Sequence, residues 1–409
     1  MSRAEDTFLL LLSAALREQV PEDPAPEAGE WEQVLRLAAE QEVLPLVFDA
    51  CVSLPSFKAL DRETRRKWQR KALGVATRQI VQTNEFLTLV LHAQAQGLDP
   101  IVFKGIVCRS LFPKPMLRPS VDEDLLIAPE EAEAYHAFFL AEGLFADNPN
   151  ADLAAADELS YHRENSPTYI ELHKSLFSRS SDAYGELNGL FEGALSRAIS
   201  VQVEDVTLRT LAPTDHFLFL LCHAYKHFLH SGVGVRQVAD MALFIRAYGA
   251  DIDWERIFDA CQSVNMETFA AALLQIAQRY LTLEKVPEGF SGIAVDIEPL
   301  MQDMISGGLY GVVDIDRLHS ANMTLGAVAA KKRGRRATGV WRSLFPGGSY
   351  LKRQFPYARK YPILLPIAWA QRVVNYIKKR GRAVNPNETI RIGQERIALL
   401  RQYHIIDND

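Results

Sequence analysis

One stretch, residues 101–127, constrains the fold of this chain more than any other. It reads IVFKGIVCRSLFPKPMLRPSVDEDLLI and predicts a short apolar strand, a Lys-Gly turn, a helix of one to two turns, a proline-rich loop and a second strand. The second strand carries Asp122 and Asp124. Residues i and i+2 of a strand point to the same face, roughly 6.5 Å apart. The stretch therefore predicts two neighbouring carboxylates beside a glycine turn that opens a helix.

The rest of the chain divides around this stretch into four predicted regions. Helical spacing of apolar residues dominates residues 30–96 and returns after residue 213, whereas residues 159–172 and 201–208 read as strand pairs joined by turn residues. We therefore predict an α+β fold that is mostly helical, with a small mixed sheet flanked by helical regions. The predicted regions are 1–97 (helical), 98–212 (the mixed-sheet core), 213–330 (helical) and 331–409 (basic and aromatic-rich).

Composition places the chain among globular proteins of a reducing compartment. Its four cysteines are scattered and form no C-x-x-C pair, which argues against a disulfide framework and a cysteine-rich zinc site. The apolar run 8–16 follows Glu5 and Asp6, so a buried helix is a better explanation than a signal peptide. No run reaches the roughly 18 to 20 apolar residues of a membrane span. We expect a cytoplasmic protein without a transmembrane segment.

Basic residues are concentrated near the end of the chain. Residues 331–382 hold 15 Lys and Arg and no Asp or Glu, so the remaining 30 basic residues stand against 51 acidic ones. Aromatic side chains are interleaved with this basic segment. Three explanations stay open: docking on anionic lipid headgroups at the inner face of the membrane, binding of nucleic acid or another polyanion, or a covering layer that pairs with the acidic remainder of the chain.

The paired aspartates are candidates for a divalent-metal site. Two-metal sites hold ions about 3.5 to 4 Å apart, bridged by shared carboxylates. Asp122 and Asp124 would supply two ligands. Glu171 is the best third candidate, because it lies on a separate predicted strand where Tyr169, Glu171 and His173 share one face. His173 either orients Glu171 or contacts substrate, or is a half-buried strand histidine.

The turn before the aspartates offers donors for phosphate. Gly105 allows backbone N–H groups to approach an anion, and the dipole of the helix that follows favours negative charge. Lys104 and Arg118 are nearby cations that would neutralise phosphate oxygens. Together with the carboxylates, these residues predict a site for Mg²⁺ or Mn²⁺ and a triphosphate.

Aspartate pairs alone are weak signals, because the chain contains others. Asp253 of the pair 251–253 is better explained as the cap of a helix that starts at Trp254. The pair 314–316 follows two glycines so closely that no helix fits between turn and strand. Residues 296–298 form a similar D-x-E pattern. Only Asp122 and Asp124 stand in the full order of strand, glycine turn, helix and acidic strand.

A later helix presents one polar face, formed by His223, Lys226, His227 and His230. Histidines at i, i+4 and i+7 can bind zinc, but Lys226 stands among them and no H-E-x-x-H pattern is present. Lining of the cleft is the preferred interpretation, with a solvated or satisfied face as the alternative. Arg236 either lines the same cleft or pairs with Asp240 four residues later.

These motifs resemble those of the nucleotidyltransferase superfamily of DNA polymerase β-like folds, and more closely a bacterial group of uncharacterised nucleotidyltransferases. The resemblance covers residues from about 30 to 380, although Ile106 stands where the superfamily has a small residue. The matching pieces are VFKG (102–105), R-x-x-x-D-x-D-L-L-I (118–127), ELH (171–173), HAYKH (223–227), G-V-G-x-R-Q (232–237) with Asp240, and the Phe-Pro, Tyr-Pro and Trp segments between 345 and 369.

The resemblance implies metal-dependent transfer of a nucleoside monophosphate from an NTP to an acceptor. Asp122, Asp124 and Glu171 would bind Mg²⁺ or Mn²⁺, with Glu171 as the base on the acceptor, and Lys104, Gly105 and Arg118 would hold the nucleotide. His173, His223, Lys226, His227 and Arg236 would line the cleft. Two rival hypotheses are a catalytically inactive nucleotide- or partner-binding protein on the same fold, and an accessory protein that works through residues 331–382 at a membrane or polyanion.

Overall fold

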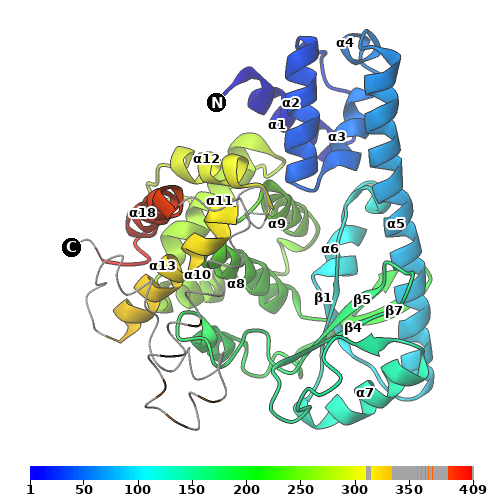
Figure 1. Cartoon of the computed structure of the whole chain (residues 1–409), viewed down its shortest axis with the longest axis vertical. Helices are drawn as coiled ribbons and strands as arrows, with labels where there is room; N and C mark the ends of the chain where they lie inside the picture. The colour runs from blue at the N-terminus through cyan, green and yellow to red at the C-terminus, as the bar shows by residue number, and fades with distance from the viewer. Residues whose placement is uncertain are drawn as a thin grey trace.

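The computed structural model describes residues 1–309, 315–333 and 386–407, together with five single positions between 334 and 385. Most of the basic segment 331–382 therefore lies outside the described residues. Helices surround one mixed β-sheet (Figure 1), which confirms the predicted α+β, mostly helical class.

The N-terminal region is helical, as predicted. Its apolar run 8–16 belongs to the first helix and is largely buried, so it is a core segment. The long helix α5 starts after Asp61, whose carboxylate accepts the N–H of Thr64, and ends before Gly97, which has a φ of 77°. It runs from the N-terminal helices to the sheet (Figure 1). The helices are α1 (Arg3–Leu16), α2 (Ala28–Glu40), α3 (Leu44–Cys51), α4 (Pro55–Lys58) and α5 (Arg62–Ala95).

The sheet has seven strands in the described part of the chain, in the order β3-β4-β5-β2-β1-β7-β6. Strand β2 lies antiparallel to β1 and parallel to β5, while β7 lies parallel to β1. Both predicted strand pairs, β4 with β5 and β6 with β7, are confirmed as antiparallel. The strands are β1 (Ile101–Phe103), β2 (Glu123–Leu126), β3 (Phe145–Ala146), β4 (Glu158–His162), β5 (Tyr169–His173), β6 (Ile199–Val203) and β7 (Val206–Thr210).

Short helices connect these strands. Helix α6 follows β1 directly at the glycine turn, and α7 covers one face of the sheet together with the C-terminal half of α5. The connecting helices are α6 (Gly105–Ser110), the 3-10 helices η1 (Pro115–Leu117), η2 (Pro129–Glu131) and η3 (Gly185–Phe191), and α7 (Ala132–Ala141).

Alternation along the strands assigns each side chain to one of two faces. Val102, Leu125 and Leu172 join the apolar cluster beneath α5 and α7, whereas Phe103 and Leu126 belong to the larger core that includes α8. This larger core also contains residues of α1 to α3 and α8 to α13. It crosses the predicted boundaries at 97 and 212, and the division into four regions stays a prediction.

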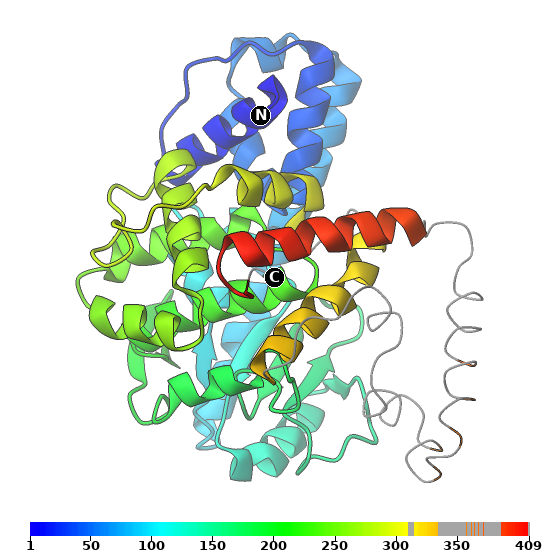
Figure 2. The same ribbon diagram turned by 90° about the vertical axis from the view of Figure 1, so that its left-hand side faces the viewer.

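After β7, the secondary structure of the described residues is helical. Helix α18 packs against α13 (Figure 2), and Tyr403 just after it is buried, with its hydroxyl donating to the carbonyl of Asp296 at 3.0 Å. The helices are α8 (Pro213–His230), α9 (Val235–Tyr248), α10 (Trp254–Ser263), α11 (Glu267–Tyr280), α12 (Glu298–Gly307), α13 (Ile315–Lys332) and α18 (Pro386–Gln402). Within the described residues, no helix is long and apolar enough to cross a bilayer.

Candidate functional site

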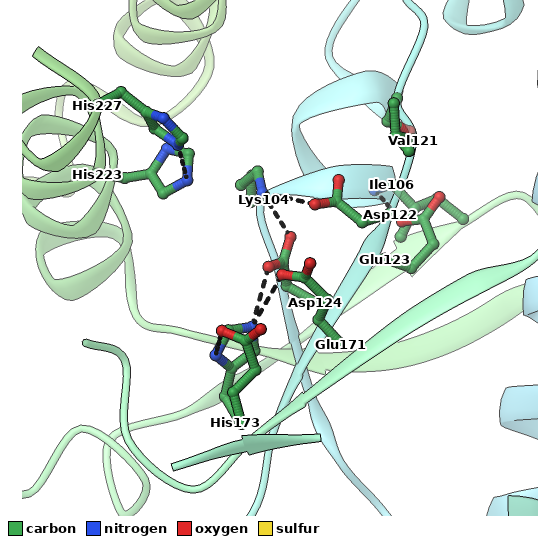
Figure 3. Close-up of polar contacts among 12 residues, drawn as sticks. Lys104, Ile106, Val121, Asp122, Glu123, Asp124, Glu171, His173, His223 and His227 are labelled. Atoms are coloured by element: carbon green, nitrogen blue, oxygen red, sulfur yellow. Dashed lines mark hydrogen bonds and ion pairs between the residues drawn. The ribbon is translucent and has the colours of Figure 1, made fainter. Parts of the chain in front are cut away.

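Asp122 and Asp124 face the same ammonium group. Lys104 Nζ lies 2.9 Å from Asp124 Oδ2 and 3.5 Å from Asp122 Oδ2 (Figure 3). The i, i+2 spacing around β2 produces this arrangement, because it directs both carboxylates to the α8 side of the sheet. The side chain of Asp124 is buried, whereas that of Asp122 is 25% exposed. The two predicted aspartates therefore form one acidic face whose nearest cation belongs to the chain itself.

Glu123, between the two aspartates, points to the opposite face of β2. Its Oε2 accepts the backbone N–H of Ile106 at 2.7 Å, and its Oε1 accepts from Arg109 Nη2 at 2.6 Å. A Cβ added to Gly105 would lie 2.2 Å from Glu123 Oε2. In this structure Gly105 therefore makes room for a carboxylate of the chain, and one N–H at the start of α6 is bonded to it. Sequence analysis assigned this N-terminus to phosphate and did not single out Glu123.

The turn at Lys104 has an unusual backbone. Lys104 has φ 58° and ψ −122°, a conformation that glycine adopts far more readily than other residues. Its N–H donates to His216 Nε2 at 3.0 Å, while His216 Nδ1 lies 3.4 Å from Thr210 Oγ1. Burial lowers the pKa of His216 to about 3, so the ring is neutral and can accept this bond at neutral pH. Sequence reasoning missed His216, which no local motif marks.

Strand β5 brings Glu171 and His173 to Asp124. The parallel register places Asp124 opposite Glu171, and His173 Nε2 lies 3.2 Å from Asp124 Oδ1 and 3.6 Å from Glu171 Oε2. Ligand atoms of these three residues all lie within 4.8 Å of one another. Among the described residues this is the one group of three or more His, Cys, Asp or Glu side chains close enough to hold a metal ion. The predicted pair of Asp124 and Glu171 is thus brought together, with His173 as a third member.

Burial and mutual contact set the charges in this cluster. Burial alone would raise the pKa of Asp124, but Lys104 and His173 hold it below its usual range. Burial alone would lower the pKa of His173, but hydrogen bonds to Asp124 and Glu171 raise it to about 9. Burial raises the pKa of Glu171. The cluster is therefore acidic, and it is balanced by two cationic side chains that lie against Asp124 from opposite sides (Figure 3).

A metal ion fits this donor set. One donor atom from each of Asp124, Glu171 and His173 lies within 4.8 Å of the other two, which is close enough for a single ion to contact all three. Two carboxylates and one imidazole form a mixed set of oxygen and nitrogen ligands. Such a set suits Mn²⁺ as well as Mg²⁺, because Mg²⁺ prefers oxygen ligands and accepts imidazole less readily. Asp124, Glu171 and the neutral form of His173 would hold the ion, so metal binding would release the proton that His173 carries without the ion.

Helix α8 closes the other side of the site with a histidine pair. His223 Nε2 and His227 Nε2 are 3.0 Å apart, and both rings lie beyond Lys104 in Figure 3. Burial lowers the pKa of both rings, and nearby cations, Lys104 among them, add to the effect. His230 instead contacts Tyr184 Oη at 3.1 Å. The expected polar face of α8 therefore divides, and only its first two histidines face Lys104.

The predicted arginines lie in buried ion pairs that join elements distant in sequence. Arg118 forms a bidentate ion pair with Asp240: its Nε donates to Oδ1 at 3.0 Å and its Nη2 to Oδ2 at 2.6 Å. Arg236 donates to Glu42 at 2.5 Å and to the carbonyl of Pro119 at 2.7 Å. Pairing with Asp240 was one of two explanations offered for Arg236, and the structure shows a bidentate pair of Asp240 with Arg118. Nucleotide contact by Arg118 stays a prediction.

The other acidic pairs belong to helix starts. Asp253 Oδ1 accepts the N–H of Arg256 at 3.0 Å, which confirms the predicted cap of α10. Asp296 Oδ1 accepts the N–H of Glu298, the first residue of α12, at 3.1 Å. Asp314 lies outside the described residues, and Asp316 lies in the first turn of α13. Of these acidic pairs, within the described residues, only Asp122 and Asp124 are recorded around one ammonium group.

Comparison with known proteins gives one match. Residues 27–282 match the family described as uncharacterised nucleotidyltransferase. The chain belongs to this family. None of the curated proteins and none of the solved structures compared with the chain matches it. The matched region contains every residue of the site described above, from Lys104 on the glycine turn to His227 on α8, so membership supports nucleotidyl transfer as the general kind of activity.

Three of the residues that support the site were not singled out from the sequence. His216 holds the Lys104 turn, Arg109 neutralises Glu123, and Glu158 lies 3.6 Å from His173 Nδ1. Only Glu158 had a usable signal. It directly precedes the predicted hairpin arm that starts at Leu159, and the structure pairs it with His173 across β4 and β5.

Proposed function

We propose that the protein transfers a nucleoside monophosphate from an NTP to an acceptor, in a reaction that depends on Mg²⁺ or Mn²⁺. One observation carries this proposal: the parallel register of β2 and β5, which sets Asp124 opposite Glu171 and adds His173. The bound ion would neutralise charge on the triphosphate and polarise the phosphate that is transferred. Asp122 would complete the acidic face, as the sequence motif predicts.

The chain's own groups have distinct proposed roles. Lys104 Nζ, beside both aspartates, would donate to phosphate oxygens of the nucleotide. Glu171 is 24% exposed at its side chain, compared with 4% for Asp124, so an acceptor hydroxyl can reach it. Glu171 is therefore the proposed base. His223 and His227 on α8 would border the space that the substrates enter, together with Lys226 and Arg236. Gly105 and Arg118 stay proposed nucleotide-binding residues, as the sequence predicts.

The decisive experiment measures both the binding of nucleotide and the release of pyrophosphate. Calorimetry with Mg²⁺ and a non-hydrolysable NTP should show binding to the wild-type chain and none to the double variant Asp122→Asn/Asp124→Asn. Release of pyrophosphate should be measured over a panel of NTPs and acceptor hydroxyl or phosphate compounds. Unchanged nucleotide binding in the double variant would refute the assignment of the site.

A second candidate function has a specific observation in its favour. Glu123 bonds the N–H of Ile106 at the start of α6, where a phosphate would otherwise accept it. A helix start closed in this way offers one donor fewer to the triphosphate, as expected of a chain that binds nucleotide or a partner without transferring the nucleotide. Metal-dependent NTP binding without pyrophosphate release for any acceptor would favour this candidate.

The basic segment has a separate proposed role as a covering layer. Its first residues pair with acidic side chains: Lys331 with Asp407 at 3.2 Å, Lys332 with Glu186 at 2.6 Å, and Arg333 with Asp182 at 2.5 Å. Docking on an anionic membrane at its inner face, or on a polyanion, is the alternative. Co-sedimentation with anionic liposomes that is lost when charges in 331–382 are reversed would favour the membrane over the covering layer.

A further inference from the structure

Lys104 occupies a place where a cation is expected. Its side chain is only 9% exposed, and its ammonium lies between the oxygens of Asp122 and Asp124 on the face that both carboxylates share (Figure 3). A buried ammonium is costly unless carboxylates compensate it, and here two are present. The position is therefore specialised for a positive charge.

The backbone conformation at Lys104 is unfavourable for a residue that carries a side chain. Glycine adopts φ 58° and ψ −122° without strain, whereas a residue with a Cβ is strained in this region. The N–H bond to His216 keeps the turn in this conformation. Strain of this kind persists where the surrounding structure requires the residue, which points to a role for the ammonium group itself.

Asp124 lies between two separate cation positions. Its Oδ2 faces Lys104 at 2.9 Å, and its Oδ1 faces the cluster with Glu171 and His173, at 3.2 Å from His173 Nε2. In two-metal sites, a shared carboxylate bridges two ions in this manner. One of the two positions here is filled by the chain, and the other is bounded by three metal-ligating side chains.

We propose that this site takes a single divalent cation, held by Asp124, Glu171 and His173, and that the Lys104 ammonium fills the place of a second metal ion. The inference rests on the proposed function and specifies its cation requirement. An ammonium neutralises phosphate oxygens and donates hydrogen bonds to them, but it is not a Lewis acid and carries no bound water. Lys104 thus acts on phosphate charge only.

The test counts metal ions in the full-length chain. Titration with Mn²⁺, followed by electron paramagnetic resonance and calorimetry, should give one bound ion per wild-type chain. The Lys104→Met variant should bind two, because Asp122 and Oδ2 of Asp124 become available as ligands. The matched control is Lys174→Met: Lys174 is also buried, but its ammonium donates to the carbonyls of Leu153 and Ala154, so this variant should still bind one ion.

A second variant covers the case in which Lys104→Met does not fold. Lys104→Gly suits the observed backbone and also removes the ammonium, so it should bind two ions as well. Two ions in the wild type, or one in both Lys104 variants, would overturn the role of Lys104 and leave the proposed function intact. No bound Mn²⁺ in the wild type would overturn both. Binding of one ion by the wild type and none by Asp124→Asn would place that ion in the cluster.

Discussion

Glu123 and Asp124 are neighbours in sequence, both are buried, and both are paired with a cation, yet they lie in different environments. Glu123 accepts from a main-chain N–H and from Arg109, and Gln82 Nε2 lies 3.3 Å from its Oε1. Among the described residues, the Asp124 carboxylate pairs with the side chains of Lys104 and His173. The first carboxylate fastens a helix to the sheet, whereas the second pairs with side chains of the proposed metal site. Burial and charge therefore do not distinguish a structural carboxylate from a candidate functional one, but the nature of the partners does.

The largest effect is expected from a variant of Asp124. Asp124→Asn keeps the shape of the side chain and removes its charge, so nucleotidyl transfer should fall by about 10³-fold or more, since transition-state charge stabilisation is lost. Pyrophosphate release measures the activity, and circular dichroism with urea unfolding should show a folded, cooperative chain. Full activity in this variant would show that Asp124 belongs to the scaffold, as Glu123 does.

Glu123→Gln should affect stability first. Arg109 is 1% exposed, so removal of its partner leaves a buried uncompensated charge and should lower the free energy of unfolding by about 3 kcal/mol. Equilibrium urea unfolding measures the change. The comparison would fail if this variant kept wild-type stability and lost only Mn²⁺ binding.

Gly105→Ala tests the contact between Glu123 and the start of α6. The added methyl group would meet Glu123 Oε2 at 2.2 Å and must displace it, which should cost about 2 kcal/mol of stability. As a control, Gly74→Ala on the exposed side of α5 meets no atom within 4 Å and should be neutral or slightly stabilising. Equal thermal shifts for the two variants would contradict the close contact between Gly105 and Glu123.

A pH dependence of stability tests the Lys104 turn. His216 has a pKa of about 3 when folded and an ordinary one, near 6.5, when unfolded. Between these values the unfolded chain binds more protons, so stability falls as the pH is lowered, by at most about 1.4 kcal/mol per pH unit from this group. His216→Gln, which keeps an acceptor for the Lys104 N–H, should flatten the slope of unfolding free energy between pH 6 and pH 4. An unchanged slope would show that His216 is not buried and neutral.

Local pattern was enough to predict the elements that carry the site. The alternation of Ile170, Glu171 and Leu172 predicted which β5 side chains face the site, and the order of turn, helix and acidic strand predicted the position of Asp124. Both follow from strand periodicity, which is a property of neighbouring residues. The burial of the N-terminal apolar run was predicted on similar grounds.

Contacts between distant segments were beyond this reasoning. Arg118 and Asp240 are 122 residues apart, and Lys104 and His216 are 112 apart, so no spacing rule relates them. The occupation of the α6 start by Glu123 was missed for a different reason. Its direction followed from the same alternation as that of Asp124, but only the packed structure shows that Gly105 leaves space for a carboxylate there.

The parallel pairing of β2 with β5 also governs when the site can form during folding. Helix α7 and strands β3 and β4 are made between these two strands, so Glu171 reaches Asp124 only after this whole excursion has closed. Loop-closure entropy makes such long-range parallel pairing slow compared with hairpins and helices. The proposed cation site is therefore completed late, and the rate at which Mn²⁺ binds during refolding would report the completion of the central sheet.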